Sequence, residues 1–185
     1  MKPVVLTCGE PAGIGPEIAA RAWATLAARI PMMWLGDPRH LPAGTPHEVI
    51  SAASEAAKVS GRALPVLPHA FAAPSTAGTP DPANAIGVIE VIARAVDLVQ
   101  SGEASAICTA PIHKKALKDG ADFAYPGHTE YLAALAGGCD VVMMLASEQL
   151  RVVPATIHIA LSEVPKALTP ALLRRTIEIT QTGLI

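Results

Sequence analysis

The sequence predicts an α/β fold: a layered sheet with helices on both faces. Of its 185 residues, 51% are hydrophobic and only 16% are charged, which excludes disorder and favours a well-buried core. Aromatic residues make up only 3%, so the core must consist of Ala, Val, Ile and Leu, a mixture that suits buried parallel strands covered by helices. Apolar, β-branched runs alternate with segments of helical periodicity, the pattern typical of a largely parallel sheet.

The amino-terminal half begins with a strand, a helix and a second strand. A short β-branched run ending in glycine predicts a buried strand at residues 3–9. Helical periodicity follows over residues 15–29, and the run "PMMWLGDP" predicts a second strand at residues 31–38. Residues 40–82 are rich in Pro, Ala and Ser, and we expect loops, short strands and one helix around residues 47–59.

The clearest helix is predicted over residues 81–103. Gly102 stands at its end, as helix-terminating glycines do. Five apolar residues are expected on one stripe of this helix: Ile86, Ile89, Ala93, Val96 and Val99.

The remaining elements continue the alternation. The expected order is a third buried strand at 104–112, a helix start at 113–117, a polar-aromatic loop at 122–135, strands at 140–147 and 151–161, and a helix at 169–182. We divide the chain into a first α/β domain, residues 1–125, and the incomplete beginning of a second, residues 126–185.

Charge and cysteine content indicate a soluble cytoplasmic protein. The net charge of −2 gives no electrostatic signature of nucleic-acid or membrane binding. Cys8, Cys108 and Cys139 lie far apart in no metal-ligand spacing, which favours reduced thiols. The first apolar run is too short for a signal peptide, and no stretch approaches the length of a membrane span.

The motif "GEPAGIGPE", residues 9–17, follows a strand and opens a helix, the position of phosphate-binding loops. Gly13 and Gly15 fit a dinucleotide fingerprint, but Ile18 occupies the place of the third glycine, and no Walker lysine follows. A tight turn and a site-lining loop both remain open. Glu10 is an acid or base, or a solvated loop carboxylate, and the second reading is favoured.

The motif "TAPIHKKAL" places His113, Lys114 and Lys115 just beyond the carboxyl end of a predicted strand. Ligands gather at that edge of open α/β sheets, and basic groups there suit an anionic substrate. Adjacent lysines are more often a solvated helix start.

The motif "YPGHTEYLA" combines a Pro-Gly turn with His128 and Thr129 at an expected helix start. Either residue can cap that helix. A Gly-His-Thr turn can equally present an imidazole and a hydroxyl to a small polar ligand, and the pattern does not choose between the two.

His158 lies within an apolar run, between Ile157 and Ile159. It is a metal ligand, a catalytic group or a core histidine. One histidine cannot hold a metal, because a stable site needs about three protein ligands. The local sequence therefore favours a buried core histidine.

Several motifs in order resemble one family, the 4-hydroxythreonine-4-phosphate dehydrogenases of the vitamin B6 pathway. The resemblance covers essentially the whole chain, but only the amino-terminal portion of the family pattern. It implies the fold of the isocitrate and isopropylmalate dehydrogenases, in truncated form. The motifs that carry it are "GEPAGIGPE", "TAPIHKKAL", "YPGHTEYLA", "VVMMLAS" and "LRVVPATIHIAL...VPKALTP".

The resemblance also implies a reaction and a site. His128 and Thr129 would contact the phosphorylated substrate, and His158 would be one ligand of a divalent metal such as Zn, Mg or Co. Two further histidines, beyond Ile185 in the family pattern, would complete the metal site between the subunits of a homodimer. With NAD or NADP the enzyme would oxidise 4-hydroxythreonine 4-phosphate to a β-keto acid, which loses carbon dioxide to give 3-amino-2-oxopropyl phosphate.

Two alternatives stay open. A paralogue would oxidise another four-carbon phosphorylated hydroxy acid, such as threonate or erythronate phosphate. A non-catalytic truncated fragment or binding module would reduce no NAD, and the present chain alone is expected to be inactive. The resemblance assigns no catalytic or cofactor-binding residue in this chain.

Overall fold

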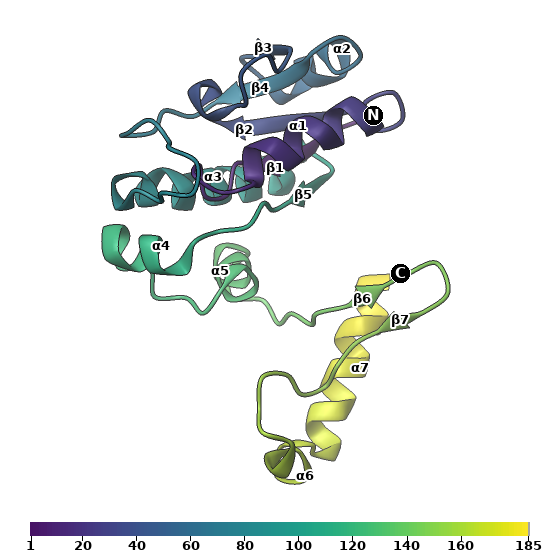
Figure 1. Cartoon of the computed structure of the whole chain (residues 1–185). Coiled ribbons are helices and arrows are strands. Elements are labelled where there is room, and N and C mark those ends of the chain that lie inside the picture. The colour runs from purple at the N-terminus through teal and green to yellow at the C-terminus, as the bar shows by residue number, and fades with distance from the viewer. Residues whose placement is uncertain (185) are drawn as a thin grey trace. The chain divides into compact units, whose positions relative to one another are not determined.

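A computed structural model describes residues 1–184 of the chain and shows two compact units. Unit 1 is Met1–Gly127 and unit 2 is His128–Ile185. Figure 1 shows the elements of each unit along the chain.

Unit 1 is built on a five-stranded sheet in the order β3-β4-β2-β1-β5. All four pairs of neighbouring strands are parallel. The strands are β1 (Val4–Thr7), β2 (Met32–Gly36), β3 (His47–Val49), β4 (Leu64–Pro68) and β5 (Ala106–Cys108).

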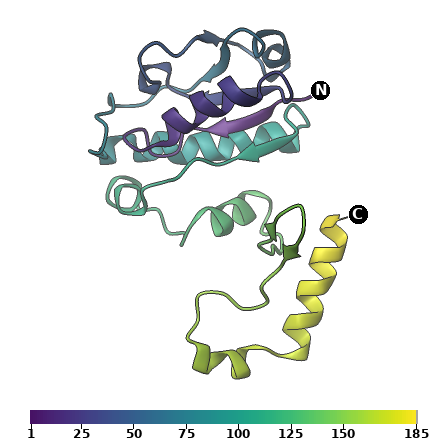
Figure 2. The same ribbon diagram turned by 45° about the vertical axis from the view of Figure 1, so that its right-hand side comes forward.

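Helices flank this sheet, which confirms the predicted α/β class. Figure 2 shows α1 on one face of the sheet and α3 on the other. The helices of unit 1 are α1 (Gly15–Leu26), α2 (Ala56–Val59), α3 (Ala85–Gln100) and α4 (Lys114–Ala121), with 3-10 turns η1 (Pro38–His40), η2 (Ala53–Glu55) and η3 (Pro82–Asn84). Residues 47–59, where short strands and one helix are expected, form β3, η2 and α2, and the helix is limited to four residues at the end of this range.

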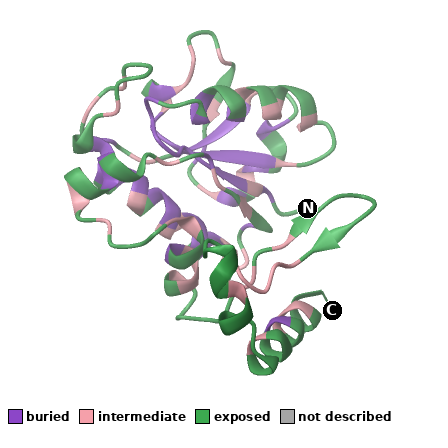
Figure 3. Cartoon of the chain, turned by 60° about the horizontal axis from the view of Figure 1, so that its bottom comes forward, coloured by how far each residue is buried: buried purple, intermediate pink, exposed green. Residues whose placement is uncertain are grey.

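The core of unit 1 is formed by the central strands and by α3. Met33, Trp34 and Leu35 of β2 are all 0% exposed, and Val5 of β1 and Leu64 of β4 are equally buried. Apolar strands covered on both faces predict this pattern, and the buried residues lie along the strands in Figure 3.

The predicted apolar stripe of α3 is wrong. Of its five residues only Val96 is buried, and Ile86 is 56% exposed. The helix is turned so that Gly87 faces the ring of Phe71, leaving no room there for a larger side chain. The buried face contains smaller residues than the stripe predicted: Ala85, Gly87, Val88, Val91, Ile92, Ala95, Val96 and Leu98.

The third buried strand expected at 104–112 is also wrong in part. The strand is only three residues long, and Ala106 and Cys108 are exposed. It pairs with β1 alone and forms an edge of the sheet. An edge strand has a neighbour on one side only, so its apolar composition does not ensure burial.

Unit 2 consists mainly of helices. They are α5 (His128–Leu135), η4 (Leu161–Glu163), α6 (Val164–Ala167) and α7 (Pro170–Leu184). Its strands, β6 (Leu145–Ala146) and β7 (Arg151–Val152), form an antiparallel two-residue ladder. The long strands predicted at 140–147 and 151–161 are therefore wrong. Within residues 1–184, β6 and β7 pair only with each other. They flank a turn in which Ser147 N donates a hydrogen bond to Leu150 O.

Unit 2 buries very little of itself. Only Tyr131 and Thr176 are buried among its described residues. Across residues 1–184, the helices are all too short or too polar to cross a lipid bilayer.

Candidate functional site

The turns that follow β1 and β5 are joined backbone to backbone at the carboxyl edge of the unit 1 sheet. Glu10 N donates to Pro111 O at 2.8 Å. Gly9 has φ +64°, and a Cβ at this position would lie 2.5 Å from the same carbonyl oxygen. Only glycine combines this backbone angle with this close approach. The two turns therefore touch at the edge of the sheet where open α/β folds usually bind ligands.

Glu10 is buried, which corrects the expectation of a solvated carboxylate. Glu10 is only 6% exposed, and its Oε1 accepts a hydrogen bond from Ala12 N at 3.0 Å. Gly13 N donates to Glu10 O at 2.9 Å. Amides that a phosphate loop would offer to a ligand are therefore used inside the turn, which supports the tight-turn interpretation of residues 9–17.

A buried aspartate at the end of β2 is a feature that sequence reasoning missed. Asp37 is 5% exposed, and its carboxylate accepts hydrogen bonds from the Arg39 side chain, from Arg39 N and from Phe71 N. Burial by itself would raise the pKa of Asp37. The hydrogen bonds from Arg39 and Phe71, with the charge of Arg39, outweigh burial and lower the pKa from 3.8 to about 2.

His113, Lys114 and Lys115 behave as a helix start. His113 Nδ1 accepts a hydrogen bond from Ala116 N at 3.1 Å and caps α4. Lys115 forms an ion pair with Asp119 one turn later, and Lys114 is exposed. A sequence signal for the cap was present, since His113 directly precedes the helical run.

His128 and Thr129 are the first two residues of α5. His128 is half-buried and Thr129 is exposed. The first amides of a helix lack partners within it and attract anions, so this position brings an imidazole, a hydroxyl and backbone donors close together.

His158 is exposed, so the expectation of a buried core histidine is wrong. It lies outside any strand and has φ 57°, in the left-handed region. A residue other than glycine in this region costs about 1–3 kcal/mol and is over-represented at functional sites. Histidine tolerates the conformation better than its flanking isoleucines would.

The described residues do not form a metal site. Within residues 1–184, no three His, Cys, Asp or Glu side chains lie close enough together to hold a metal ion. His158 therefore has at most part of a ligand set in this structure, and one imidazole is not enough to bind zinc stably. The structure brings His128 and Thr129 together, and places His158 on a separate segment of the same unit.

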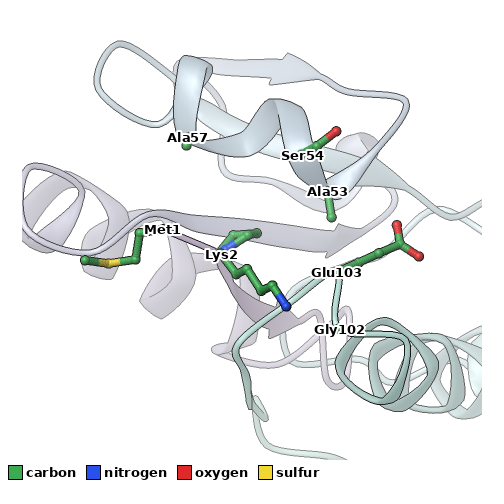
Figure 4. Close-up of a pocket in the computed structure, with 8 residues that line it drawn as sticks. Met1, Lys2, Ala53, Ser54, Ala57, Gly102 and Glu103 are labelled. Atoms are coloured by element: carbon green, nitrogen blue, oxygen red, sulfur yellow. The ribbon is translucent and has the colours of Figure 1, made fainter.

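A hollow in unit 1 lies at the other edge of its sheet, where the strands begin. It has a volume of about 440 Å³ and is lined by residues that precede β1 and β5, together with η2 and α2. Figure 4 shows Lys2 and Glu103 among the residues that line it. None of the predicted site residues contributes to this hollow, and amino ends of parallel strands are not where ligands usually bind.

The fold of the chain is found in other solved structures, including one of low sequence identity. A terephthalate 1,2-cis-dihydrodioldehydrogenase from Burkholderia xenovorans shares it, with a TM-score of 0.62 and 22% identity over 96% of this chain and 55% of that chain. A model of one family, "Pyridoxal phosphate biosynthetic protein PdxA", matches residues 27–185. The chain belongs to this family.

Named relatives agree with the family match. The 4-hydroxythreonine-4-phosphate dehydrogenase of Roseobacter denitrificans is 66% identical over 98% of this chain, and that of a Ruegeria species is 63% identical over 98%. A crystal structure of a 4-hydroxythreonine-4-phosphate dehydrogenase from Burkholderia phymatum superposes with a TM-score of 0.87 at 34% identity, over 100% of this chain and 58% of that chain. The chain spans about half the length of the curated relatives it matches, 56% in the first two.

Proposed function

We propose that this chain forms part of an NAD(P)-dependent dehydrogenase that oxidises 4-hydroxythreonine 4-phosphate. The product is a β-keto acid that decarboxylates to 3-amino-2-oxopropyl phosphate, a step of vitamin B6 biosynthesis. The observation that carries the proposal is the family match over residues 27–185, which includes His128, Thr129 and His158.

His128 and Thr129 bind the substrate phosphate in this proposal. Their place at the start of α5 supports it, because helix amides and a threonine hydroxyl can donate hydrogen bonds to phosphate oxygens. The half-buried imidazole of His128 would add a charge-assisted hydrogen bond when it is protonated.

His158 supplies one ligand of a divalent metal in this proposal, and an exposed imidazole is free to do so. The residues described here do not fit a complete site, since no further pair of suitable side chains joins it within residues 1–184. The remaining ligands would come from outside these residues, through a longer chain or the second subunit of a homodimer.

The experiment is an activity assay of the natural protein that contains this chain. NAD(P)H formation is followed with 4-hydroxythreonine 4-phosphate, threonate phosphate and erythronate phosphate as substrates. Preference for the first supports the proposal, and preference for either of the others identifies a paralogue. No reduction of NAD or NADP with any of them contradicts dehydrogenase activity.

Variants separate the roles of the site residues. His158→Ala is expected to lower activity by at least about 100-fold and to reduce bound metal, because loss of mere supporting groups around a metal already costs 10–100-fold. Thr129→Val is expected to raise KM for substrate by about 10-fold or more, from the lost hydrogen bond to a charged group. His47→Ala, an exposed histidine of β3, is the matched control and should change neither.

The mass and metal content of the natural protein give an independent check. A mass near 19.0 kDa together with no bound divalent metal would exclude the metal-dependent enzyme for this molecule.

A further inference from the structure

The connection between β4 and α3 is anchored to the rest of unit 1 at Phe71. Phe71 N donates to Asp37 Oδ2 at 3.2 Å, and the Arg39 guanidinium donates to Phe71 O at 2.8 Å. The Phe71 ring is buried, at 6% exposure, and lies against Gly87 of α3. Both backbone polar groups and the side chain of this residue are thus fixed.

The two ends of the loop that follows are tied together at a neck. Ala73 N donates to Asn84 Oδ1 at 2.9 Å, and Ala73 O lies 3.1 Å from His40 Nε2, which must carry the proton because a carbonyl only accepts. Asn84 and His40 are 2% and 6% exposed. A loop with such a closed neck is an Ω-loop, a type that is frequently functional.

The tip of this loop, residues 74–80, is held far more weakly. It is exposed or half-buried, and its turn is closed internally by Thr79 N donating to Thr76 O at 3.0 Å. Over the described chain, a single hydrogen bond joins the tip to the rest of unit 1: Gly78 N donates to Ala12 O at 2.8 Å. A Cβ added at Gly78 would meet no atom within 4 Å, so the tip is not packed there.

Glu10 determines where the tip attaches. Its carboxylate accepts from Ala12 N, so the peptide groups on both sides of Ala12 are fixed, with the carbonyl available to Gly78. The attachment point lies in the turn after β1, at the carboxyl edge of the parallel sheet.

We propose that residues 74–80 form a lid over this edge of unit 1, pivoting at the neck formed by Ala73 and Asn84. The lid opens when the hydrogen bond between Gly78 N and Ala12 O breaks, and Glu10 is the positioning residue that favours the closed state. Opening breaks only one hydrogen bond, so the free-energy difference between the closed and open states is small, and an open state populated at about 0.1–10% is expected. The inference is independent of the proposed function, because it concerns only contacts within unit 1.

The test is backbone ¹⁵N relaxation dispersion on the full chain, which detects the μs–ms motions typical of lids. Ala12, Ala77, Gly78 and Thr79 are expected to share one exchange process, while Ala73 and Asn84 show none. Flat dispersion at the tip, or the same process at the neck, would overturn the proposal.

Variants test the part assigned to Glu10. Glu10→Ala is expected to raise the open population by about tenfold, whereas Glu10→Gln keeps an acceptor for Ala12 N and should stay within about twofold of the natural protein. Glu55→Ala is the matched control, since its carboxylate is exposed and accepts from Ser51 instead. An unchanged open population in Glu10→Ala would show that Glu10 does not position the lid. If this variant does not fold, the relaxation dispersion of tip and neck in the natural protein still tests whether the lid opens.

Discussion

Unit 1 and unit 2 differ in how many of their side chains are buried. Unit 1 buries most of its three central strands, and the carboxylates of Glu10 and Asp37 accept hydrogen bonds at the carboxyl edge of its sheet. Unit 2 buries only Tyr131 and Thr176 among its described residues, yet it carries all three predicted site residues. The buried core and the residues of the proposed chemistry therefore lie in different units of the described chain.

Matched leucine truncations should give the largest difference between the units. Leu64→Ala in β4, at 0% exposure, is expected to destabilise the chain by about 2–5 kcal/mol through lost burial and a cavity. Leu173→Ala in α7, at 46% exposure, should cost less than about 1 kcal/mol. Urea unfolding followed by circular dichroism measures both. Equal losses in the two variants would show that α7 is as well packed as β4.

The same substitution in two helices should have opposite signs. A Cβ on Gly120 of α4 would lie 2.0 Å from Pro82 O, so Gly120→Ala is expected to destabilise by about 1–3 kcal/mol. Gly183 of α7 has open space around it, and Gly183→Ala should stabilise slightly, by up to about 1 kcal/mol, because alanine favours helix. Thermal unfolding of the two variants compares them, and a lower Tm for Gly183→Ala would contradict the open surroundings of that residue.

Two aspartate–arginine pairs should differ in their pH dependence. The folded-state pKa of Asp37, about 2, lies below its ordinary value of 3.8. The ionised Asp37 carboxylate therefore contributes about 2 kcal/mol to the free energy of unfolding. This contribution is fully present above pH about 4 and is lost as the pH falls toward 2. Asp37→Asn should remove this dependence, measured as the free energy of unfolding between these pH values.

The exposed pair is the control for that measurement. Asp140 forms an ion pair with Arg175 in unit 2, with side chains 57% and 63% exposed. Asp140→Asn is expected to cost less than about 1 kcal/mol, and less still in high salt. A loss as large as that of Asp37→Asn would show that exposure does not weaken this pair.

The sequence predicts elements best where the local pattern is sufficient. The buried runs of β1 and β2 and the helical periods of α1 and α7 are found where they are expected. The strands at 140–147 and 151–161 fail because apolar, β-branched residues form a strand only beside a partner strand, and here the ladder is two residues long. The α3 stripe fails because the position of Phe71, a residue distant in sequence, decides which face of the helix is buried.

The site is less predictable for the same reason. Motif spacing locates His128 and Thr129 at a helix start, and the structure has α5 begin there. The burial of Glu10 depends on Ala12 and on the Pro111 turn, and that of Asp37 on Phe71, contacts that no local pattern encodes. The roles of His128, Thr129 and His158 in substrate and metal binding stay predictions from the family resemblance.

The three cysteines provide a ready means of labelling. Cys8 is buried, and burial raises the pKa of its thiol well above the usual range, so little thiolate forms at neutral pH and alkylating reagents react slowly with it. Cys108 and Cys139 are exposed, one in each unit. Two spectroscopic probes can therefore be attached to the natural sequence without mutagenesis, and the distance between them would measure the separation of the two units in solution.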